Sequence, residues 1–274
     1  MNWNKRLLGT PIIGDITKKI VSIKASHEAY NIAEHFTQFL EPQIAVNSLL
    51  KEEAFKIRHN VYCEELGFEK VKEGGLEKDE FDEQSIFSLI KHKPSSIYTS
   101  CVRMVRVEKE GQLLPIEKFC LDSITDEKLH PSRFNRKEIC EISRLAVTAD
   151  FRRRKTDQFK GSGTGVIQES SYSEVELRCF PFIAIGLYMS SAIMAAGTGI
   201  RHVYVMMEPR LARSMKFVGI KFQQLGEPID YHGLRAPYYI TPAEFYSNLS
   251  PGFKNLYKAI EHDICEQLGK FKQI

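Results

Sequence analysis

The sequence lacks the cysteine patterns that mark disulfide frameworks and metal sites. Its six cysteines are scattered, no two of them form a C-x-x-C pair, and none stands near a histidine at zinc-ligand spacing. The eight histidines form no ligand pattern either. Isolated cysteines are typical of reduced thiols in a cytosol. We therefore expect a cytoplasmic protein without a bound metal and without a permanently bound cofactor.

A strong excess of one charge is also missing. The 274 residues include 38 Lys and Arg against 35 Asp and Glu, which gives a net charge of +3. This excess is too weak to predict nucleic-acid binding. The apolar share of 43% and the charged share of 27% are ordinary for globular proteins and exclude collagen-like, disordered and coiled-coil chains. A chain of this length buries a sizeable core.

The sequence shows neither a secretory signal nor a clear membrane span. Gly9, Pro11 and Gly14 interrupt the apolar residues near the N-terminus. Residues 179–200 carry no charge, and about 18 apolar residues suffice to cross a bilayer. However, the helical stretch in this segment would start at Pro181, glycines end it, and a β-branched run follows at once. The pattern favours a helix buried against a sheet, and it leaves open contact with a membrane surface but not a span.

Small side chains along this uncharged helix allow a neighbouring element to approach closely. They are Gly186, Ser190, Ser191 and Ala195.

The hydrophobic periodicity predicts helices and strands in mixed order. Helices are expected over residues 27–40, 51–66, 181–197, 209–218 and 253–271. Strands are expected over 86–91, 98–107, 139–147 and 202–207, with two short strands within 222–240. This order is typical of the α/β (α+β) class, with helices on both faces of a mixed sheet. We expect an N-terminal extension with a helix over 1–45, a main domain over 46–240, and a C-terminal helical extension over 241–274.

Three arginines stand inside otherwise apolar elements, namely Arg58, Arg103 and Arg144. A buried guanidinium needs carboxylate partners, because an unpaired buried charge is costly. The polar loop of residues 69–83, called the acidic loop below, can supply them, with Glu77, Asp79 and Asp82 as the candidates. Two interpretations stay open. Either an ion-pair network fixes this loop and lines a polar cleft, or the arginines project outward from one-sided elements.

The segment Glu141-Ile-Ser-Arg-Leu-Ala-Val147 combines strand character with polar side chains. Strand alternation places Glu141, Ser143, Leu145 and Val147 on one face of the sheet and Arg144 on the other. Glu141 and Ser143 can therefore share a site. Arg144 joins them only if a β-bulge re-aims its side chain.

These motifs occur together in a known group of enzymes. Arg58-x3-Tyr62-x5-Phe68, the acidic positions 77, 79 and 82, then Arg103 and Glu141-x-Ser143-Arg144 resemble the pattern of the autoinducer (acyl-homoserine-lactone) synthases. That family typically has Phe and Trp where this chain has Tyr62 and Phe68.

Segments 61–68, 141–147 and 231–237 more closely resemble the PEP-CTERM/exosortase-system-associated acyltransferases and the related N-acyl amino acid synthases. The resemblance spans about residues 50 to 240. It implies the GNAT fold, a mixed sheet splayed after its fourth strand, where the arm of an acyl thioester inserts.

The resemblance also implies an activity, the direct transfer of a long-chain fatty acyl group from a thioester of acyl carrier protein or CoA to the amine of an amino acid or small amine. Glu141 would act as general base, and Ser143 and Arg144 would complete the catalytic group. Backbone N–H groups near Val147 would hold the thioester carbonyl, with Leu145 and Phe182 beside it. The alternatives are an ion pair for Glu141, a plain strand hydroxyl for Ser143, and core packing for Phe182.

The donor site departs from that of acetyl-CoA-using GNAT enzymes. Gln158-Phe-Lys-Gly-Ser-Gly163 has the letters of their phosphate loop, but it lies well past Val147 and no apolar helix follows directly. Whether it binds phosphate stays open. Autoinducer synthases lack this loop and commonly use acyl carrier protein, which is acidic. The basic run of Arg152, Arg153, Arg154 and Lys155 is therefore a candidate docking patch, or else a solvated loop tip.

Three functions follow from this pattern. The first is an N-acyltransferase without lactone formation, which Phe68 and the terminal extensions favour. The second is an acyl-homoserine-lactone synthase that uses S-adenosylmethionine. The third is a non-catalytic module that binds acyl groups or carrier protein.

Overall fold

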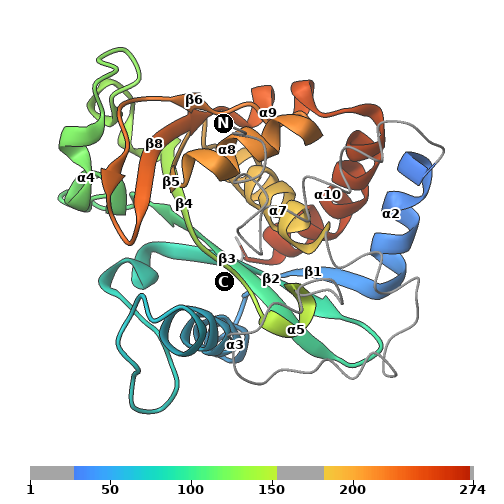
Figure 1. The fold of residues 1–274 in the computed structure, drawn as a ribbon. Helices are drawn as coiled ribbons and strands as arrows, with labels where there is room; N and C mark the ends of the chain where they lie inside the picture. Colours follow the sequence, from blue (N-terminus) through green and yellow to red (C-terminus); the bar gives the residue numbers. More distant parts are fainter. Residues whose placement is uncertain (1–27, 153–181, 272–274) are drawn as a thin grey trace, which may run out of the picture.

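The computed structural model describes residues 28–152 and 182–271. An eight-stranded sheet runs through them in the order β1-β2-β3-β4-β5-β8-β6, and β7 pairs with β8 (Figure 1). The strands are β1 (Leu40–Ile44), β2 (Ser85–His92), β3 (Ile97–Arg106), β4 (Ile139–Val147), β5 (His202–Met207), β6 (Gln223–Gln224), β7 (Ile229–Asp230) and β8 (Leu234–Ile240).

Helices cover both faces of this sheet, which confirms the predicted fold class (Figure 1). The longer helices are α2 (Glu28–Phe39), α3 (Ser48–Arg58), α7 (Ile183–Gly197) and α10 (Pro251–Phe271). Short helices are α4 (Pro115–Phe119), α5 (Ala149–Arg152), α8 (Pro209–Met215) and α9 (Pro242–Asn248). A π-helix, η2 (His59–Glu65), continues α3, and the 3-10 turns are η3 (Glu80–Gln84), η4 (Leu121–Ser123), η5 (Pro131–Arg133), η6 (Arg136–Glu138) and η10 (Lys216–Val218).

Strand alternation divides the core into two layers. On β2, Ile86 and Ile90 pack in the layer of α2, α7 and α10, whereas Phe87 and Leu89 pack in the layer of α3. Both faces of this strand are thus buried, which explains its nearly continuous apolar sequence.

Helix α7 is the uncharged segment identified in the sequence, and it lies between the sheet and α10 (Figure 1). Close packing occurs at Gly186, where a Cβ atom would lie 2.7 Å from Cζ of Phe36 and 3.1 Å from Cδ1 of Ile90. Across residues 28–152 and 182–271, no helix combines the length and the apolar character that a membrane span requires.

Strand β1 was not expected from the sequence, which predicts helix through Leu40. Pro42 explains the difference, because proline cannot continue a helix and pushes the preceding residue toward an extended conformation. Its position is compatible with a strand because β1 pairs only with β2 and forms an edge of the sheet. Leu40 and Ile44 join the same apolar core as Leu256 and Ile264 of α10. Both terminal segments therefore contribute to one core, and the boundaries at 45/46 and 240/241 stay a prediction.

The sheet opens between β4 and β5. These parallel strands pair through three residue pairs, Ile139 with His202, Cys140 with Val203, and Glu141 with Tyr204. Beyond them, β4 continues to Val147 and β5 to Met207 without pairing to each other. The parting that the resemblance implies therefore occurs directly after Glu141.

Candidate active site

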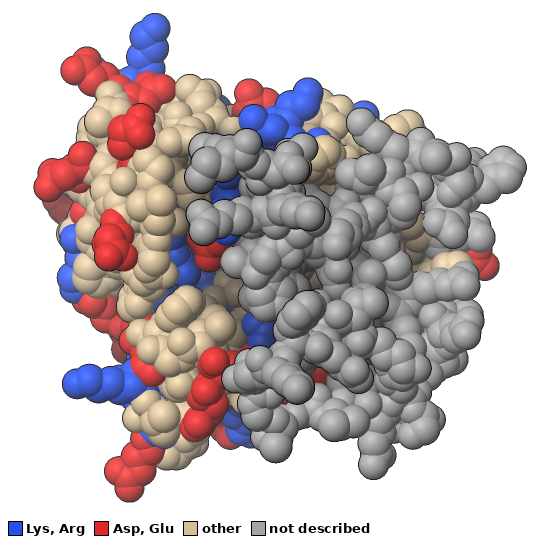
Figure 2. Space-filling view, viewed as in Figure 1, with Lys and Arg blue, Asp and Glu red and all other residues tan. Residues whose placement is uncertain are grey.

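A polar cleft of about 590 Å3, counting its open mouth, lies on the face of the sheet where β4 leaves β5. In the space-filling view, this side of the molecule is hollowed between its upper and lower described parts, and basic and acidic side chains meet there (Figure 2). The cleft is lined by Tyr62, Phe68, Glu69, Asp79, Phe81, Arg103, Pro115, Phe119, Glu141, Ser143, Arg144, Met206, Tyr231, His232 and Arg235.

A β-bulge brings Arg144 into this cleft. Cys101 of β3 pairs with Ala146, but Arg103 pairs with Ser143, so that Arg144 and Leu145 both lie opposite a single residue of β3. Arg144 has a φ of 51°, in the left-handed region that few non-glycine residues adopt. The bulge therefore turns the Arg144 side chain to the face that carries Glu141 and Ser143, as the sequence required for a shared site.

Glu141 is the buried carboxylate of the cleft. The residue is only 3% exposed to solvent. Its Oε2 accepts a hydrogen bond of 2.6 Å from the backbone N–H of Ile116 in α4. Burial raises the pKa of Glu141 to about 8, although the Ile116 N–H and the nearby Arg103 and Arg144 oppose the shift. No lysine or arginine among the described residues forms an ion pair with it. Few favourable interactions therefore stabilise the negative charge of Glu141 in this low-dielectric environment.

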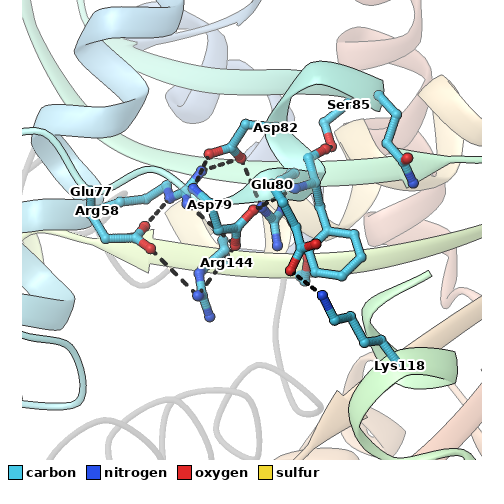
Figure 3. A network of polar contacts seen from close by, with 12 residues as sticks. Arg58, Glu77, Asp79, Glu80, Asp82, Ser85, Lys118 and Arg144 are labelled. Carbon is cyan, nitrogen blue, oxygen red and sulfur yellow. Dashed lines mark hydrogen bonds and ion pairs between the residues drawn. The ribbon is translucent and has the colours of Figure 1, made fainter. Parts of the chain in front are cut away.

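The three arginines pair with carboxylates of the acidic loop. Figure 3 shows Arg58 and Arg144 beside Glu77 and Asp79. Arg58 is fully buried; its Nε donates to Glu77 and its Nη1 donates to Oδ1 of Asp82 at 2.6 Å. Arg103 donates to Asp79 and, at 2.7 Å, to Asp82.

Arg144 completes the network from the bulge. Its Nη2 lies 3.1 Å from Oε1 of Glu69, 3.4 Å from Oε1 of Glu77 and 3.3 Å from Oδ2 of Asp79. Burial opposes ionisation of Asp79, but the guanidinium groups around it outweigh that effect and lower its pKa. The arginines therefore do not project into solvent.

Ser143 is connected to this network. Nε of Arg103 donates to Oγ of Ser143 at 3.2 Å, which fixes the hydroxyl as an acceptor on that side. Its own proton is then directed elsewhere. Arg103 thus links the acidic loop to the hydroxyl in the cleft.

Tyr62 of the π-helix η2 contacts both residues of the bulge. The Tyr62 hydroxyl donates to the backbone carbonyl of Leu145 at 2.7 Å, and the guanidinium carbon of Arg144 lies 5.5 Å from the centre of the Tyr62 ring. π-Helical turns often occur at functional sites. Leu145 therefore contacts Tyr62, a residue that lines the cleft, through its main-chain carbonyl.

The side chains of the other described residues predicted for thioester binding and docking do not line the polar cleft. Val147 is 7% exposed and belongs to the core, and Phe182 packs against Phe253 with ring centres 6.2 Å apart. Arg152 forms an ion pair with Glu65. Arg153, Arg154, Lys155 and the Gln158–Gly163 segment lie outside the described residues.

A second, apolar pocket lies on the opposite face of the opening. It is lined by Ile142 of β4, Val203 and Val205 of β5, and side chains from α7 and α9, which include Tyr188, Ser191, Ala192 and Phe245. Other apolar residues of α7, namely Ile185, Leu187, Met189 and Met194, pack in the core, and Met206 of β5 lines the polar cleft.

Sequence reasoning missed the upper wall of the cleft, which includes Phe119, Tyr231, His232 and Arg235. His232 has a φ of 51°, which agrees with a tight turn before β8. Its ring also lies 6.0 Å from the Phe68 ring, and its Nε2 lies 3.9 Å from Oε1 of Glu69. Only the resemblance of segment 231–237 offered a signal for these residues.

The described residues contain no group of three His, Cys, Asp or Glu side chains arranged to hold a metal ion. The carboxylates of the acidic loop point to guanidinium groups instead. The cleft therefore presents a buried carboxylate, a hydroxyl and several guanidinium groups, which suits proton transfer and the binding of anions.

Comparisons with known proteins agree with this architecture. Residues 57–160 match the profile of the family described as acetyltransferase (GNAT) domain. No curated protein sequence matches the chain. Among solved structures, TofI, crystallised in a ternary complex with an inhibitor and MTA, is 15% identical with a TM-score of 0.55, over 77% of this chain and 98% of TofI.

Two further structures represent the two branches predicted from the sequence. BjaI, a CoA-dependent acyl-homoserine lactone synthase solved with SAM and isopentyl-CoA, is 17% identical with a TM-score of 0.52, over 82% of this chain and 89% of its own. FeeM, an N-acyl amino acid synthase from uncultured soil microbes, is 14% identical with a TM-score of 0.50, over 78% and 97%. At these identities the likeness shows the fold. The chain therefore contains a segment, residues 57–160, that is similar to the GNAT acetyltransferase domain, and it has the fold of the acyl-homoserine-lactone and N-acyl amino acid synthases.

Proposed function

We propose that this protein is an acyltransferase, which joins a long-chain fatty acyl group to the amine of an amino acid or a related small molecule. The observation that carries the proposal is Glu141, a buried carboxylate without a cationic partner in the described chain, at the point where the sheet opens. An enzyme that acylates an amine must first remove a proton from the ammonium. A carboxylate with a raised pKa is suited to accept it.

The reaction proceeds by direct transfer. Glu141 takes a proton from the acceptor ammonium, directly or through one water, and the free amine attacks the thioester carbonyl carbon. The tetrahedral intermediate then expels the thiolate, which takes up the remaining proton from nitrogen, so that an amide and a thiol result. Burial raises the pKa of Glu141 to about 8, so that the proton transfer from an ammonium is less unfavourable than it would be to an ordinary carboxylate.

Ser143 and Arg144 position the reactants. The Ser143 hydroxyl, held on one side by Arg103, is available to orient the amine or the bridging water. Arg144, held by three carboxylates, supplies positive charge beside the reaction centre. Main-chain N–H groups of β4 beyond Glu141, toward Val147, hold the thioester carbonyl.

The apolar pocket behind the opening receives the acyl chain. It lies against the unpaired ends of β4 and β5, and its walls are carbon-rich side chains such as Ile142 and Val205. A thioester that passes between the two strands thus has its head in the polar cleft and its tail in this pocket. Acyl carrier protein or CoA is the donor, and the basic run from Arg152 is the docking patch for a carrier protein.

A cytoplasmic location, which the isolated cysteines favour, and a place in a PEP-CTERM/exosortase system, which the sequence resemblance favours, belong to the same proposal.

The lactone branch is the alternative function. Solved neighbours include TofI with MTA and BjaI with SAM, so that a site for S-adenosylmethionine exists on this fold. A non-catalytic module is less compatible with Glu141, because a buried, uncompensated carboxylate destabilises the protein and binding alone does not require it.

One assay separates the three functions. The full chain is incubated with long-chain acyl carrier protein or acyl-CoA and a panel of amines, and free thiol and N-acyl product are measured by mass spectrometry. Product with amino acids supports the proposal, and thioester consumption only with S-adenosylmethionine selects the lactone synthase. Binding without turnover selects the module. Undiminished turnover of Glu141→Gln at saturating amine would remove Glu141 as the base.

A further inference from the structure

The exposed side of α8 carries a concentration of positive charge. Residues 209–226 contain two arginines, two lysines and no acidic residue, although the whole chain is nearly balanced at 38 Lys and Arg against 35 Asp and Glu. The four cations, Arg210, Arg213, Lys216 and Lys221, are all exposed. No carboxylate within residues 28–152 and 182–271 forms an ion pair with any of them. The described part of the chain therefore leaves their charge unneutralised.

An aromatic side chain lies among these cations. Phe217 of η10, the turn that continues α8, is 44% exposed. Positions 210, 213, 216 and 217 are three or four residues apart, which places them on one side of the helical segment. On the other side, Ala212, Met215 and Val218 are buried in the same core as α7 (Figure 1). We refer to the exposed side as the α8 surface, which consists of Arg210, Arg213, Lys216, Phe217 and Lys221.

The α8 surface adjoins the apolar pocket. Phe222, which follows Lys221 directly, lines that pocket. The Phe222 ring packs against Tyr238 of β8, with ring centres 6.3 Å apart. Burial raises the pKa of Tyr238, and the positive charge of nearby Arg213 opposes the shift. The basic residues and the wall of the apolar pocket are therefore neighbours.

The composition of the α8 surface fits a lipid membrane better than a protein partner. A stable protein interface takes about 20 to 30 residues from each side and is depleted of lysine at its core. An anionic lipid surface instead attracts each lysine or arginine separately, and an exposed aromatic ring enters the boundary between headgroups and acyl chains. Two arginines and two lysines around one phenylalanine meet these requirements.

We propose that the α8 surface binds the anionic lipids of a membrane, with its four cations at the headgroups and the Phe217 ring among the outermost acyl carbons. The apolar pocket then lies close to the lipid, because Phe222 belongs to its wall. A long acyl chain passes between this pocket and the membrane with little exposure to water, which lowers the cost of its transfer. The binding itself does not depend on the reaction that the polar cleft catalyses.

Flotation of the full chain with lipid vesicles tests the binding. Vesicles of equal parts phosphatidylglycerol and phosphatidylcholine should carry the protein to the top of a density gradient, and vesicles of phosphatidylcholine alone should not. The combined variant Arg213→Gln, Lys216→Gln and Lys221→Gln should bind about 100-fold more weakly, at about fivefold for each charge removed. Added salt should weaken the binding of the wild type, because it screens exposed charges.

The matched control removes three charges elsewhere on the surface. Lys70→Gln, Lys109→Gln and Lys137→Gln together change three exposed lysines and lower the net charge by the same amount. This control should bind nearly as well as the wild type, because its lysines lie outside the α8 surface. Thermal unfolding of both combined variants beside the wild type verifies that they are folded.

A fluorescent side chain reports whether the ring at position 217 enters the lipid. The chain has one tryptophan, Trp3, so that Trp3→Phe combined with Phe217→Trp leaves a single indole on the α8 surface. Its emission should move to shorter wavelength with the phosphatidylglycerol vesicles, because the indole leaves water. With phosphatidylcholine alone the emission should stay unchanged.

Three outcomes overturn the inference. The first is a wild type that does not float with the anionic vesicles, and the second is equal flotation of the α8 variant and its matched control. The third is emission from the Phe217→Trp protein that the anionic vesicles do not shift. If vesicle binding is unchanged in the α8 variant while its KM for acyl carrier protein rises, the partner of this surface is a protein. Absence of N-acyl product in every reaction would count against the proposed function and leave the vesicle result standing.

Discussion

At the scale of single residues, the environment of Glu141 dominates the chemistry of the cleft. The carboxylate is almost fully withdrawn from water and receives one hydrogen bond, from the Ile116 N–H. Desolvation destabilises its ionised form more than the nearby guanidinium groups stabilise it. Its protonation state therefore changes in a pH range where ordinary carboxylates are already ionised, and two predictions follow from this shift.

The first concerns the rate of acyl transfer. The base is active only when ionised, so kcat/KM for the acceptor should rise with pH and level off above about 8. Acceptors whose amine pKa values differ serve as controls, because a limb set by Glu141 stays in place when the acceptor changes. Glu141→Gln should lower the rate by about 10²- to 10⁴-fold and lose this limb. A limb that follows the amine pKa would instead assign the titration to the acceptor.

The second concerns stability. In the unfolded chain Glu141 ionises near pH 4.5, whereas in the folded protein its pKa is about 8. Between these values the folded state holds the extra proton, so stability falls as pH rises, by a few kcal/mol at most, at ~1.4 kcal/mol per pKa unit. Glu141→Gln lacks this term and should gain stability relative to the wild type from pH 5 to pH 9. Urea unfolding at pH 5, 7 and 9 measures the difference, with Ser143→Ala expected to parallel the wild type.

At the scale of elements, the lack of a side chain at Gly186 determines how closely α7 packs against its neighbours. The aromatic ring of Phe36 from α2 occupies the space that a Cβ atom at Gly186 would take. Phe36 is completely buried and cannot swing away. Helix α7 therefore lies as close to α2 and β2 as its backbone permits.

A pair of glycine substitutions tests this packing. Gly186→Ala should destabilise the protein by about 1–3 kcal/mol, because an added methyl group overpacks a filled core. Gly269→Ala in α10 meets no atom within 4 Å and should stabilise by about 0.5–1 kcal/mol through helix propensity. Thermal unfolding of both variants measures the contrast. Equal effects would show that helix propensity alone governs these sites.

The apolar pocket on α7 predicts how acyl length is selected. Ala192 lines that pocket, whereas Ala196, one turn later on the same helix, is exposed. Ala192→Phe should fill the pocket and shift the preferred donor to shorter acyl chains, with Ala196→Phe as the matched control. Competition between acyl donors of different length, read by mass spectrometry of the product, measures the shift. An unchanged preference in Ala192→Phe would place the acyl chain elsewhere.

The scale of elements also explains what the sequence could predict. The β4 strand was predictable because its alternation is strong. The ion-pair network was predictable because a buried arginine requires acidic partners. Even the need for a bulge at Arg144 follows from the two-residue period. The edge strand β1 is short and contains Pro42, which obscures its period, and α4 and α9 are too short for a periodic signal. Their presence depends on the core they cover.

At the scale of the whole molecule, the upper wall of the cleft could not be predicted from local patterns. His232 and Arg235 reach the cleft only because β8 pairs with β5, which in turn pairs with the first residues of β4. Those contacts join segments far apart in sequence, and the hydrophobic periodicity within one segment does not predict them. The same holds for the α4 N–H that meets Glu141.

The brevity of the β4–β5 ladder has a mechanical consequence. Three residue pairs are the seam between a half-sheet of β1 to β4 and a half-sheet of β5 to β8. A thioester whose amide groups face the free edge of β4 would supply rungs that this seam lacks. The bound donor would then join the two half-sheets as an additional strand. When the thiol leaves, the three β4–β5 residue pairs alone would connect them again.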